Sequence, residues 1–198
     1  MSTVIVGLGN PGKEYERTRH NAGRLAVMLL AKEEGLDDFV ENKKAIALVT
    51  KGDIGGEKVT LVLPETQMNL SGKATIPFVK SVKAAKTLIV VRDDLDMPVG
   101  ALKMTFARGS GGHKGVESIM RALKTESFAQ LKIGISPKTP KGKAKKPSGE
   151  EKVIKHVLGK FSPAEEPLLK KTLKRAAEAC RLFASEGIEK AMMEANTK

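Results

Sequence analysis

Two polar side chains near the N-terminus are spaced so that they could act on one ligand. Asn10 lies in the glycine-rich stretch Gly7-Leu8-Gly9-Asn10-Pro11-Gly12, and His20 follows a short polar segment. Because a strand end and the start of the next helix are neighbours in an α/β fold, we expect Asn10 and His20 to converge. A histidine in this position could equally be an ordinary residue at a helix entry.

Three carboxylates follow residues 87–91, an apolar run that is typical of a central buried strand. Asp93, Asp94 and Asp96 are therefore expected at the carboxyl end of the sheet, where open α/β folds collect functional groups. They could bind a metal ion, but hard cations usually take more oxygen ligands, and the protein's three histidines lack the spacing of a ligand set. The simpler chemistry is an Asp that fixes the tautomer of an imidazole, so that the other ring nitrogen can take a proton from water. We expect no metal site.

Gly7, Gly9 and Gly12 match the dinucleotide-binding pattern G-x-G-x-x-G, and glycines keep the backbone bare for a close approach. That pattern requires a helix to begin at the third glycine. Residues 13–19 are polar and lack helical periodicity, and the second predicted strand ends in Lys51 and not in an acidic residue. A nicotinamide-dependent oxidoreductase is therefore disfavoured.

Two further segments could contact a ligand. The glycine-dense loop 109–115 precedes a predicted helix and is suited to presenting backbone amides to an anion, or it could be a flexible crossover. Asn69 follows a predicted strand end, where its side chain could bind a ligand or simply cap the next helix.

Hydrophobic periodicity and turn residues predict the elements that position these groups. Asn21 is a suitable N-cap for a helix that runs to Glu34 and ends at Gly35. The other predicted strands lie at 4–6, 45–50, 58–63, 87–91, 101–106 and 130–136, with a turn at 52–56. Further helices are predicted at 70–82 (weak before Pro77) and 116–123. A C-terminal helical segment is predicted over 163–195, and a capping box at Ser162-Pro163-Ala164-Glu165 opens its long helix. This order predicts one α/β domain over residues 1–198, a three-layer α/β/α sandwich with a mixed, mostly parallel sheet.

The chain is strongly basic, with 35 Lys and Arg against 23 Asp and Glu and a net charge of +12. Such an excess attracts polyanions by counterion release, although a merely soluble basic surface is the alternative. With no Trp and one Tyr, the chain lacks stacking platforms for bases, so an RNA would be held by its phosphates and shape. Lysines among prolines and glycines at 137–151 predict a mobile loop, either an RNA-contacting arm or a solvated surface loop.

Other features bear on the environment of the protein. The sequence has no apolar run long enough to cross a bilayer, and its N-terminus enters a strand too early for a signal or transit peptide. We therefore expect a bacterial-type cytoplasmic protein, or a processed organellar one. Cys180, the single cysteine, cannot form an internal disulfide and is expected on a helix face.

Four separated motifs in one order resemble the bacterial-type peptidyl-tRNA hydrolases. They are Gly-Leu-Gly-Asn-Pro-Gly with Thr-Arg-His-Asn (7–12 and 18–21), Gln-Met-Asn-Leu-Ser-Gly (67–72), Arg-Asp-Asp-Leu-Asp (92–96) and Gly-Ser-Gly-Gly-His-Lys-Gly (109–115). The resemblance implies a compact, monomeric α/β/α fold with a groove at the strand ends and no metal or organic cofactor. It also implies hydrolysis of the ester between a peptide and the 3′-terminal ribose of tRNA, which recycles stalled peptidyl-tRNA.

The same resemblance implies roles for individual residues. His20 would be the general base on the attacking water, with Asp93 holding its imidazole. The positions expected to contact the peptide and the 3′ end of tRNA are Asn10, Tyr15, Met68, Asn69, His113 and Lys114. The positions expected to grip the acceptor stem and its 5′-phosphate are Lys103, Arg108 and Lys132.

Lys114 is the main departure from the family pattern, because relatives usually carry an asparagine there to orient the water or the substrate. A lysine keeps hydrogen-bond donors, loses the acceptor and adds a charge, so it could stabilise an oxyanion, clamp a phosphate or weaken catalysis. The rival hypothesis is a non-catalytic RNA-binding protein on the same fold, since plant organelle splicing factors also resemble this family. The presence of Asn10, His20, Asn69 and Asp93 favours the enzyme.

Overall fold

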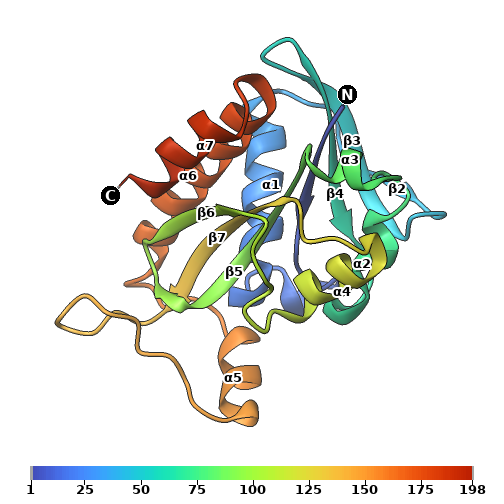
Figure 1. Ribbon diagram of the computed structural model, residues 1–198. Coiled ribbons are helices and arrows are strands. Elements are labelled where there is room, and N and C mark those ends of the chain that lie inside the picture. Colours follow the sequence, from blue (N-terminus) through green and yellow to red (C-terminus); the bar gives the residue numbers. More distant parts are fainter. Residues whose placement is uncertain (1, 198) are drawn as a thin grey trace.

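The first strand shows how the sheet is buried on both faces. β1 (Thr3–Gly7) is buried throughout, and Ile5 belongs to one hydrophobic cluster while Val4 and Val6 belong to another. Because side chains alternate along a strand, both faces of this sheet must be covered. Figure 1 presents the resulting arrangement in the computed structural model, which describes residues 2–197: one twisted sheet between two layers of helices.

A seven-stranded sheet forms the centre of the fold. Its strands are β1, β2 (Val40–Asn42), β3 (Ala47–Ile54), β4 (Glu57–Pro64), β5 (Leu88–Pro98), β6 (Leu102–Phe106) and β7 (Ala129–Ser136), in the spatial order β2-β3-β4-β1-β5-β7-β6. The four central strands, β4, β1, β5 and β7, are parallel, and the outer pairs are antiparallel. The predicted mixed, mostly parallel sheet is confirmed, and the carboxyl ends of its central strands meet at one edge.

Helices cover both faces of the sheet. They are α1 (Ala22–Glu33), α2 (Ser71–Thr75), α3 (Val82–Ala85), α4 (Lys114–Leu123), α5 (Glu150–Val157), α6 (Glu166–Ser185) and α7 (Ile188–Asn196), with 3₁₀ turns η1 (Lys13–Tyr15), η2 (Arg19–Asn21) and η3 (Met68–Leu70). α1, α6 and α7 pack in the cluster that contains Ile5, while α2, α3 and α4 pack in the cluster that contains Val4. Among residues 2–197, none of these helices has the length and apolar character of a membrane span.

Several strands differ from the prediction for local reasons. β3 continues through Gly52 to Ile54, so the hairpin turns at Gly55 and Gly56, both with positive φ, and not over 52–56. β5 extends beyond residue 91 and has an irregularity between Asp94 and Pro98. β2 lies outside the predicted elements because it is a short edge strand whose side chains are exposed or half-buried, which leaves no hydrophobic pattern to detect.

The helical predictions also need correction. The predicted helix 70–82 is only α2, and the chain leaves the helical path before Pro77, which cannot continue a helix. α5 begins at Glu150, inside the predicted lysine-rich loop 137–151. The Glu165 side chain accepts a hydrogen bond from the Ser162 backbone N–H at 2.7 Å, as a capping box requires, but α6 starts only at Glu166.

Close packing between α1 and the sheet explains two of the glycines. A Cβ atom on Gly7 would lie 2.9 Å from both the Gly23 carbonyl oxygen and Val27, and one on Gly23 would lie 2.1 Å from the Val91 carbonyl oxygen. The bare backbone of the glycine motif therefore accommodates the protein's own helix. That helix begins at Ala22 and not at Gly12, unlike the helix of a dinucleotide-binding unit.

Candidate active site

Two histidines meet one buried carboxylate, Asp93, in the middle of β5, just past the end of its pairing with β1. His20 Nδ1 and His113 Nε2 each lie 2.9 Å from Asp93 Oδ1. Asp93 is 2% exposed and His113 is 9% exposed, whereas the side chain of His20 is 15% exposed. The fold thus brings His20 and Asp93 together as expected, and His113, a predicted substrate-binding residue, joins them from the loop before α4.

The hydrogen-bond partners assign the protons on both rings. An ionised carboxylate can only accept hydrogen bonds, so both imidazoles donate to Asp93. His113 Nδ1 then carries a lone pair, which accepts hydrogen bonds from the backbone N–H groups of Gly115 (3.2 Å) and Val116 (3.4 Å). His20 donates through Nδ1, which leaves the lone pair on Nε2. His20 therefore has the tautomer that can accept a proton from water.

Burial and the contact with Asp93 shift the pKa of each histidine in opposite directions. Burial lowers the pKa of His20, but the charge of Asp93 and the hydrogen bond to it outweigh this effect, so the pKa is raised overall. Burial of His113 lowers its pKa despite the contact with Asp93. Burial alone would raise the pKa of Asp93, but the two histidines hold it far below its usual range. At neutral pH Asp93 is ionised and His113 is neutral, and His20 is the group that titrates.

The facing atoms of His20, Asp93 and His113 lie within 4.8 Å of one another, so they could be considered metal ligands. The sequence spacing of the histidines did not indicate this grouping, because only folding brings two of them to one carboxylate. A metal on His113 Nε2 would move the ring proton to Nδ1, which faces two backbone N–H donors. Donors aimed at a protonated nitrogen repel it, so the cluster fits a hydrogen-bond network better than metal coordination.

Asn10 is held by Asn21 and in turn contacts Met68. Asn21 Oδ1 accepts a hydrogen bond from the Asn10 backbone N–H at 2.8 Å, and Asn21 Nδ2 donates to the Asn10 carbonyl oxygen at 3.0 Å. Asn10 Oδ1 accepts from the Met68 backbone N–H at 3.0 Å. The prediction of Asn21 as the side-chain cap of α1 is wrong, because its amide is used to clamp the glycine-rich turn. Asn10 and Met68 thus lie together, as two predicted substrate-binding residues should.

The residue before His20 anchors its loop to α6. The Arg19 guanidinium donates to Glu165 at 2.7 and 3.1 Å and to the Ile135 carbonyl oxygen at 2.9 Å, and it lies 4.8 Å from the ring centroid of Phe161. Its backbone N–H donates to the Gly159 carbonyl oxygen. These contacts fix the segment that carries His20. The partners of Arg19 lie far from it along the chain. In the sequence, only the Thr-Arg-His-Asn motif drew attention to this residue.

The glycine-dense loop 109–115 holds His113 in place through backbone hydrogen bonds. Ser110 accepts hydrogen bonds from the backbone N–H groups of Gly112 and His113, and the N–H groups of Gly115 and Val116 point at the His113 ring. These backbone amides were expected to face an anion, but they are satisfied within the protein. The loop therefore positions an imidazole at the start of α4 and does not present those four amides to a ligand.

Arg92, within the buried part of β5, ties this loop to the strand that carries Asp93. Its guanidinium donates to the Asp93 carbonyl oxygen at 2.8 Å and to the Ser110 carbonyl oxygen at 3.3 Å, and it pairs with Asp94 at 3.2 Å. Burial lowers the pKa of Arg92, while Asp94 raises it. A charge this deep in the protein needs such partners. Arg92 thus has a supporting role that its place in the motif did not reveal.

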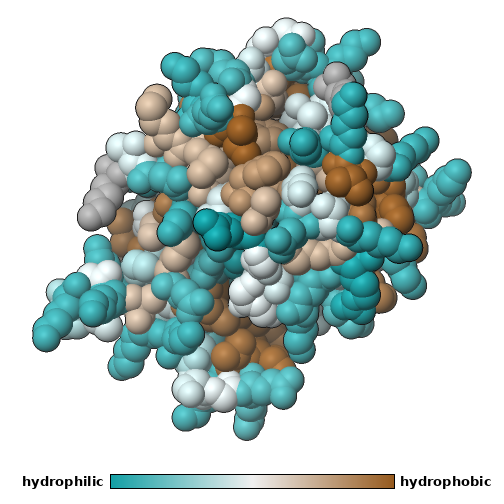
Figure 2. Space-filling model, in the orientation of Figure 1, coloured by the Kyte–Doolittle hydropathy of each residue, from teal (hydrophilic) through white to brown (hydrophobic). Residues whose placement is uncertain are grey.

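A cavity of about 280 Å³ opens beside the cluster, between Lys114 and α5. His20 and Asp93 line one wall, and Val153 and Ile154 of α5 line the opposite one. Figure 2 shows hydrophobic residues (brown) near the foot of the molecule, where α5 lies in Figure 1, among hydrophilic ones (teal). Lys114 Nζ lies 4.0 Å from Glu150 Oε1, and both residues line this cavity.

The other predicted substrate residues lie near the loops of the site. Asn69 is exposed in η3, and Leu70 occupies the N-cap position of α2, so Asn69 does not have the alternative capping role. Tyr15 is half-buried, and its carbonyl oxygen accepts hydrogen bonds from the backbone and hydroxyl of Thr18. Its observed contacts are therefore with its own loop.

Two of the three basic residues expected to bind tRNA lie together. Lys103 of β6 is directly opposite Lys132 of β7, and Lys132 is opposite Arg92 of β5. Burial, followed by the charge of Arg92, lowers the pKa of Lys132. Arg108 is exposed beyond the far end of β6, where its carbonyl oxygen accepts a hydrogen bond from Gln130, so it does not join this pair. Two lysines facing each other in register form a surface that favours an anion.

Comparison with known proteins identifies the family. The profile of the peptidyl-tRNA hydrolase family matches residues 4–198. The chain is 43% identical over 194 residues to the peptidyl-tRNA hydrolase of Carboxydothermus hydrogenoformans, covering 98% of this chain and 97% of that protein. It is 41% identical over 184 residues to that of Aquifex aeolicus, covering 92% and 90%. The crystal structure of peptidyl-tRNA hydrolase from Acinetobacter baumannii superposes with a TM-score of 0.88 at 34% identity, covering 99% of this chain and 95% of that one. The chain therefore belongs to the peptidyl-tRNA hydrolase family, whose members are hydrolases.

Proposed function

We propose that this protein hydrolyses the ester between a peptide, or an N-blocked amino acid, and the 3′-terminal ribose of tRNA, and that it acts as a monomer in the cytoplasm. The observation that carries the proposal is the state of His20. Its Nδ1 proton is donated to buried Asp93, which leaves a basic Nε2 on a side chain that is still partly exposed. Family membership supplies the substrate class, and this geometry supplies a base that can act on it.

In the proposed mechanism His20 Nε2 removes a proton from the attacking water. Asp93 keeps the ring in the required tautomer and stabilises the imidazolium that forms. A base positioned in this way contributes about 10²- to 10⁴-fold to the rate. Donors near the scissile carbonyl supply further stabilisation of the developing oxyanion, and the side-chain amides of Asn10 and Asn69 are our candidates.

His113 acts in this scheme through Asp93. Its Nδ1 is committed to two N–H groups of α4, so its Nε2 must carry a proton and point that proton at Asp93. Asp93 is thereby kept as an acceptor for His20 as well. We assign His113 to positioning, and Tyr15 and Met68 to the walls around the peptide end of the substrate.

The tRNA side of the substrate requires phosphate contacts. Lys103 and Lys132 face each other at the edge of the sheet beside Arg92, and they are our candidates for the grip on the acceptor stem and its 5′-phosphate. Arg108 would contact a different part of the RNA, because it lies beyond the end of β6 and apart from the two lysines. Neutral variants of these residues should weaken tRNA binding and flatten its salt dependence.

Lys114 has two effects in this proposal. It lines the cavity, where its Nζ lies 4.0 Å from Glu150 Oε1, and its charge lowers the pKa of His20. A lower pKa keeps more of the base unprotonated near neutral pH, so the lysine partly offsets the effect of Asp93. This role differs from that of an asparagine that orients water.

The test is release of the acyl group from purified N-blocked aminoacyl-tRNA, with tRNA binding measured in parallel at several salt concentrations. We expect release by the wild-type protein. A protein that binds tRNA in a salt-sensitive way but releases nothing would instead be the non-catalytic RNA-binding alternative, and Lys114→Asn would then be the first reversion to examine.

A further inference from the structure

His156 is the one histidine of the chain without a part in the proposed mechanism. It lies in the last turn of α5, where its Nε2 is 3.1 Å from the Ile135 carbonyl oxygen of β7. A carbonyl oxygen only accepts hydrogen bonds, so Nε2 carries the proton and donates. The residues of α5 that line the cavity beside His20 are different ones: Glu150, Val153, Ile154 and Val157. His156 therefore connects α5 to the sheet and does not form part of the cavity surface.

The Ile135 carbonyl oxygen is shared by two donors. It also accepts a hydrogen bond from Arg19 Nη1 at 2.9 Å, and Arg19 directly precedes His20. The backbone N–H of Arg19 donates to the carbonyl oxygen of Gly159, two residues beyond the end of α5, at 2.9 Å. We call the shared oxygen, together with Arg19 and His156, the Ile135 junction. It joins the segment that carries His20 to the helix that forms the opposite wall of the cavity.

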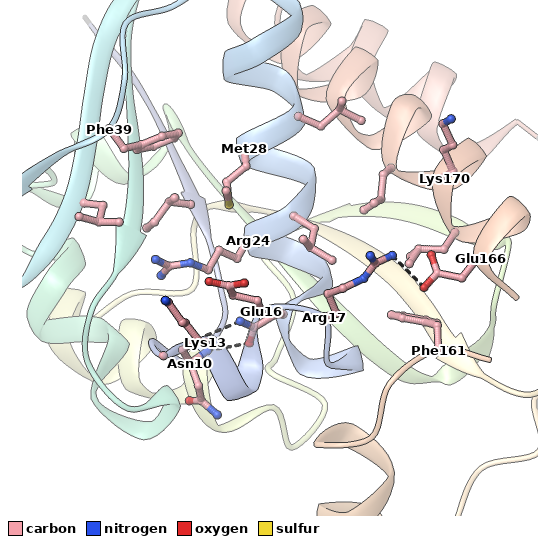
Figure 3. A pocket seen from close by; sticks show the side chains of 18 of the residues that line it. Asn10, Lys13, Glu16, Arg17, Arg24, Met28, Phe39, Phe161, Glu166 and Lys170 are labelled. Carbon is pink, nitrogen blue, oxygen red and sulfur yellow. Dashed lines mark hydrogen bonds and ion pairs between the residues drawn. The ribbon is translucent and has the colours of Figure 1, made fainter. Parts of the chain in front are cut away.

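The two donors of the Ile135 junction are anchored to different extents. The Arg19 guanidinium also pairs with Glu165 at 2.7 Å and lies 4.8 Å from the ring centroid of Phe161. Figure 3 shows Phe161 on the segment between α5 and α6, where it borders a second pocket. Within residues 2–197, the side chain of His156 makes no hydrogen bond besides the one to Ile135. Loss of the His156 side chain should thus release α5 and leave Arg19 in place.

Apolar contacts alone do not fix the position of α5. Val157 is buried in the core and Val153 packs against it, but hydrophobic contacts are non-directional. A hydrogen bond, in contrast, needs its donor and acceptor within a narrow range of distance and angle. His156 therefore supplies a directional contact between α5 and β7 that the two valines do not.

His156 donates as a neutral imidazole. Burial and the charge of Arg19 lower its pKa, and the hydrogen bond to Ile135 and the charges of Glu165 and Asp93 do not offset this shift. At neutral pH, no second positive charge thus competes with Arg19 at the shared oxygen. A neutral amide N–H could take the place of the imidazole, so glutamine is the matched replacement.

We propose that His156 is a positioning residue for the hydrolysis, which holds the α5 wall at a set distance from His20 through the Ile135 junction. Its effect is on substrate binding in the cavity, because the ion pair of Arg19 with Glu165 keeps the His20 segment in place without it. This inference rests on the proposed function, which places the ester of the substrate beside His20.

The experiment measures kcat and KM for N-blocked aminoacyl-tRNA with the wild type, His156→Ala and His156→Gln. In His156→Ala we expect KM to rise about fivefold, the value of one neutral hydrogen bond, while kcat stays within about twofold. His156→Gln keeps an N–H donor for the Ile135 carbonyl oxygen and should restore the wild-type KM. Lys155→Ala, a change of the exposed neighbour on α5, is the control and should leave KM unchanged.

A merely structural role of His156 predicts a different result. Loss of folded protein lowers the number of active molecules and hence the apparent kcat, but it leaves KM alone. That result in His156→Ala, or the same raised KM in His156→Gln as in His156→Ala, would overturn the inference. If the wild type releases nothing, the proposed function itself fails. The inference is then decided by the Kd of the uncleaved substrate, which should rise about fivefold in His156→Ala and not in His156→Gln.

Discussion

The cluster of His20, Asp93 and His113 and the segment that faces it across the cavity have opposite kinds of charged contact. Asp93 is buried and accepts hydrogen bonds from two histidines. The ion pairs of the facing segment, residues 137–157, are Lys146–Asp96 at 2.6 Å and Lys114–Glu150 at 4.0 Å, and all four side chains are more than 60% exposed. The end of this segment is anchored by buried Val157 and by the contact of His156 with the Ile135 carbonyl oxygen. Buried charge-assisted bonds fix geometry, whereas exposed pairs are weak and screened by salt. The charged contacts of the cluster are thus buried, whereas those of the facing segment are exposed.

Asp93→Asn should produce the largest effect. An amide at this position no longer stabilises the imidazolium of His20 and need not hold its Nδ1 proton, so the release rate should fall about 10²- to 10⁴-fold. Asp96→Asn, which removes the β5 partner of the exposed pair with Lys146, is the matched control, and its rate should stay within about twofold because surface pairs contribute little. Rates for Asp93→Asn close to wild type would remove Asp93 from the mechanism.

Glu165→Gln tests the buried support behind His20. It leaves the Arg19 guanidinium buried without its anionic partner, which should lower the free energy of unfolding by about 3 kcal/mol in urea titrations. Burial would raise the pKa of Glu165, but the hydrogen bonds from Arg19 and Ser162 lower it overall. This contribution is therefore present above the ordinary pKa of a glutamic acid and is lost as the pH falls through the lowered one.

The neighbouring variant Glu166→Gln is the control for Glu165→Gln. Glu166 pairs with Arg17 at the surface, so its loss should cost about 1 kcal/mol or less. Equal losses for the two variants would show that the Arg19–Glu165 pair is not the buried anchor described above.

Lys114→Asn should have a smaller effect, visible in the pH profile of kcat/KM. The pKa of His20 is raised overall, and activity should increase with pH through this raised value because the base must be unprotonated. Lys114 lowers this pKa, so its removal should move the acidic limb to higher pH and slow release below neutral pH. Lys174→Asn, a change of an exposed lysine on α6, should leave the limb in place. A limb that does not move in Lys114→Asn would contradict the electrostatic role of this lysine.

Lys146→Gln should have the smallest effect. It breaks the exposed pair with Asp96, and the midpoint of urea unfolding should stay close to the wild-type value, with any difference vanishing at high salt, because exposed pairs are weak and screened. A large, salt-independent drop in this midpoint would show that the facing segment is held as firmly as the cluster of His20, Asp93 and His113.

The sequence predicted those parts of the fold that depend on local pattern. The apolar run at 87–91 became the first part of β5, and the polar residues after it lie beyond the end of β1 together with His20. Gly112 before His113 indicated a loop, but the neighbouring residues do not determine which way the His113 side chain points. Only the tertiary fold shows that His113 turns inward to Asp93 and that its ring caps α4.

Side-chain partners that are distant along the chain could not be predicted. Asn21 has the residue type of a helix cap, and the competing use of its amide depends on how closely Asn10 approaches. The same holds for Arg19 and Glu165, which meet only after α6 has packed on the sheet. α5 escaped prediction because its sequence, at the end of a lysine-rich loop, has few apolar residues and few contacts to enforce a pattern.

The most direct test of the central claim is peptide release from N-blocked aminoacyl-tRNA by the wild type and by His20→Ala, with a chelator present and with tRNA affinity measured for both. We predict release by the wild type, no detectable release by His20→Ala, and the same salt-dependent affinity for tRNA in both proteins. Turnover by His20→Ala at the rate of the wild type would contradict the assignment of His20 as the general base.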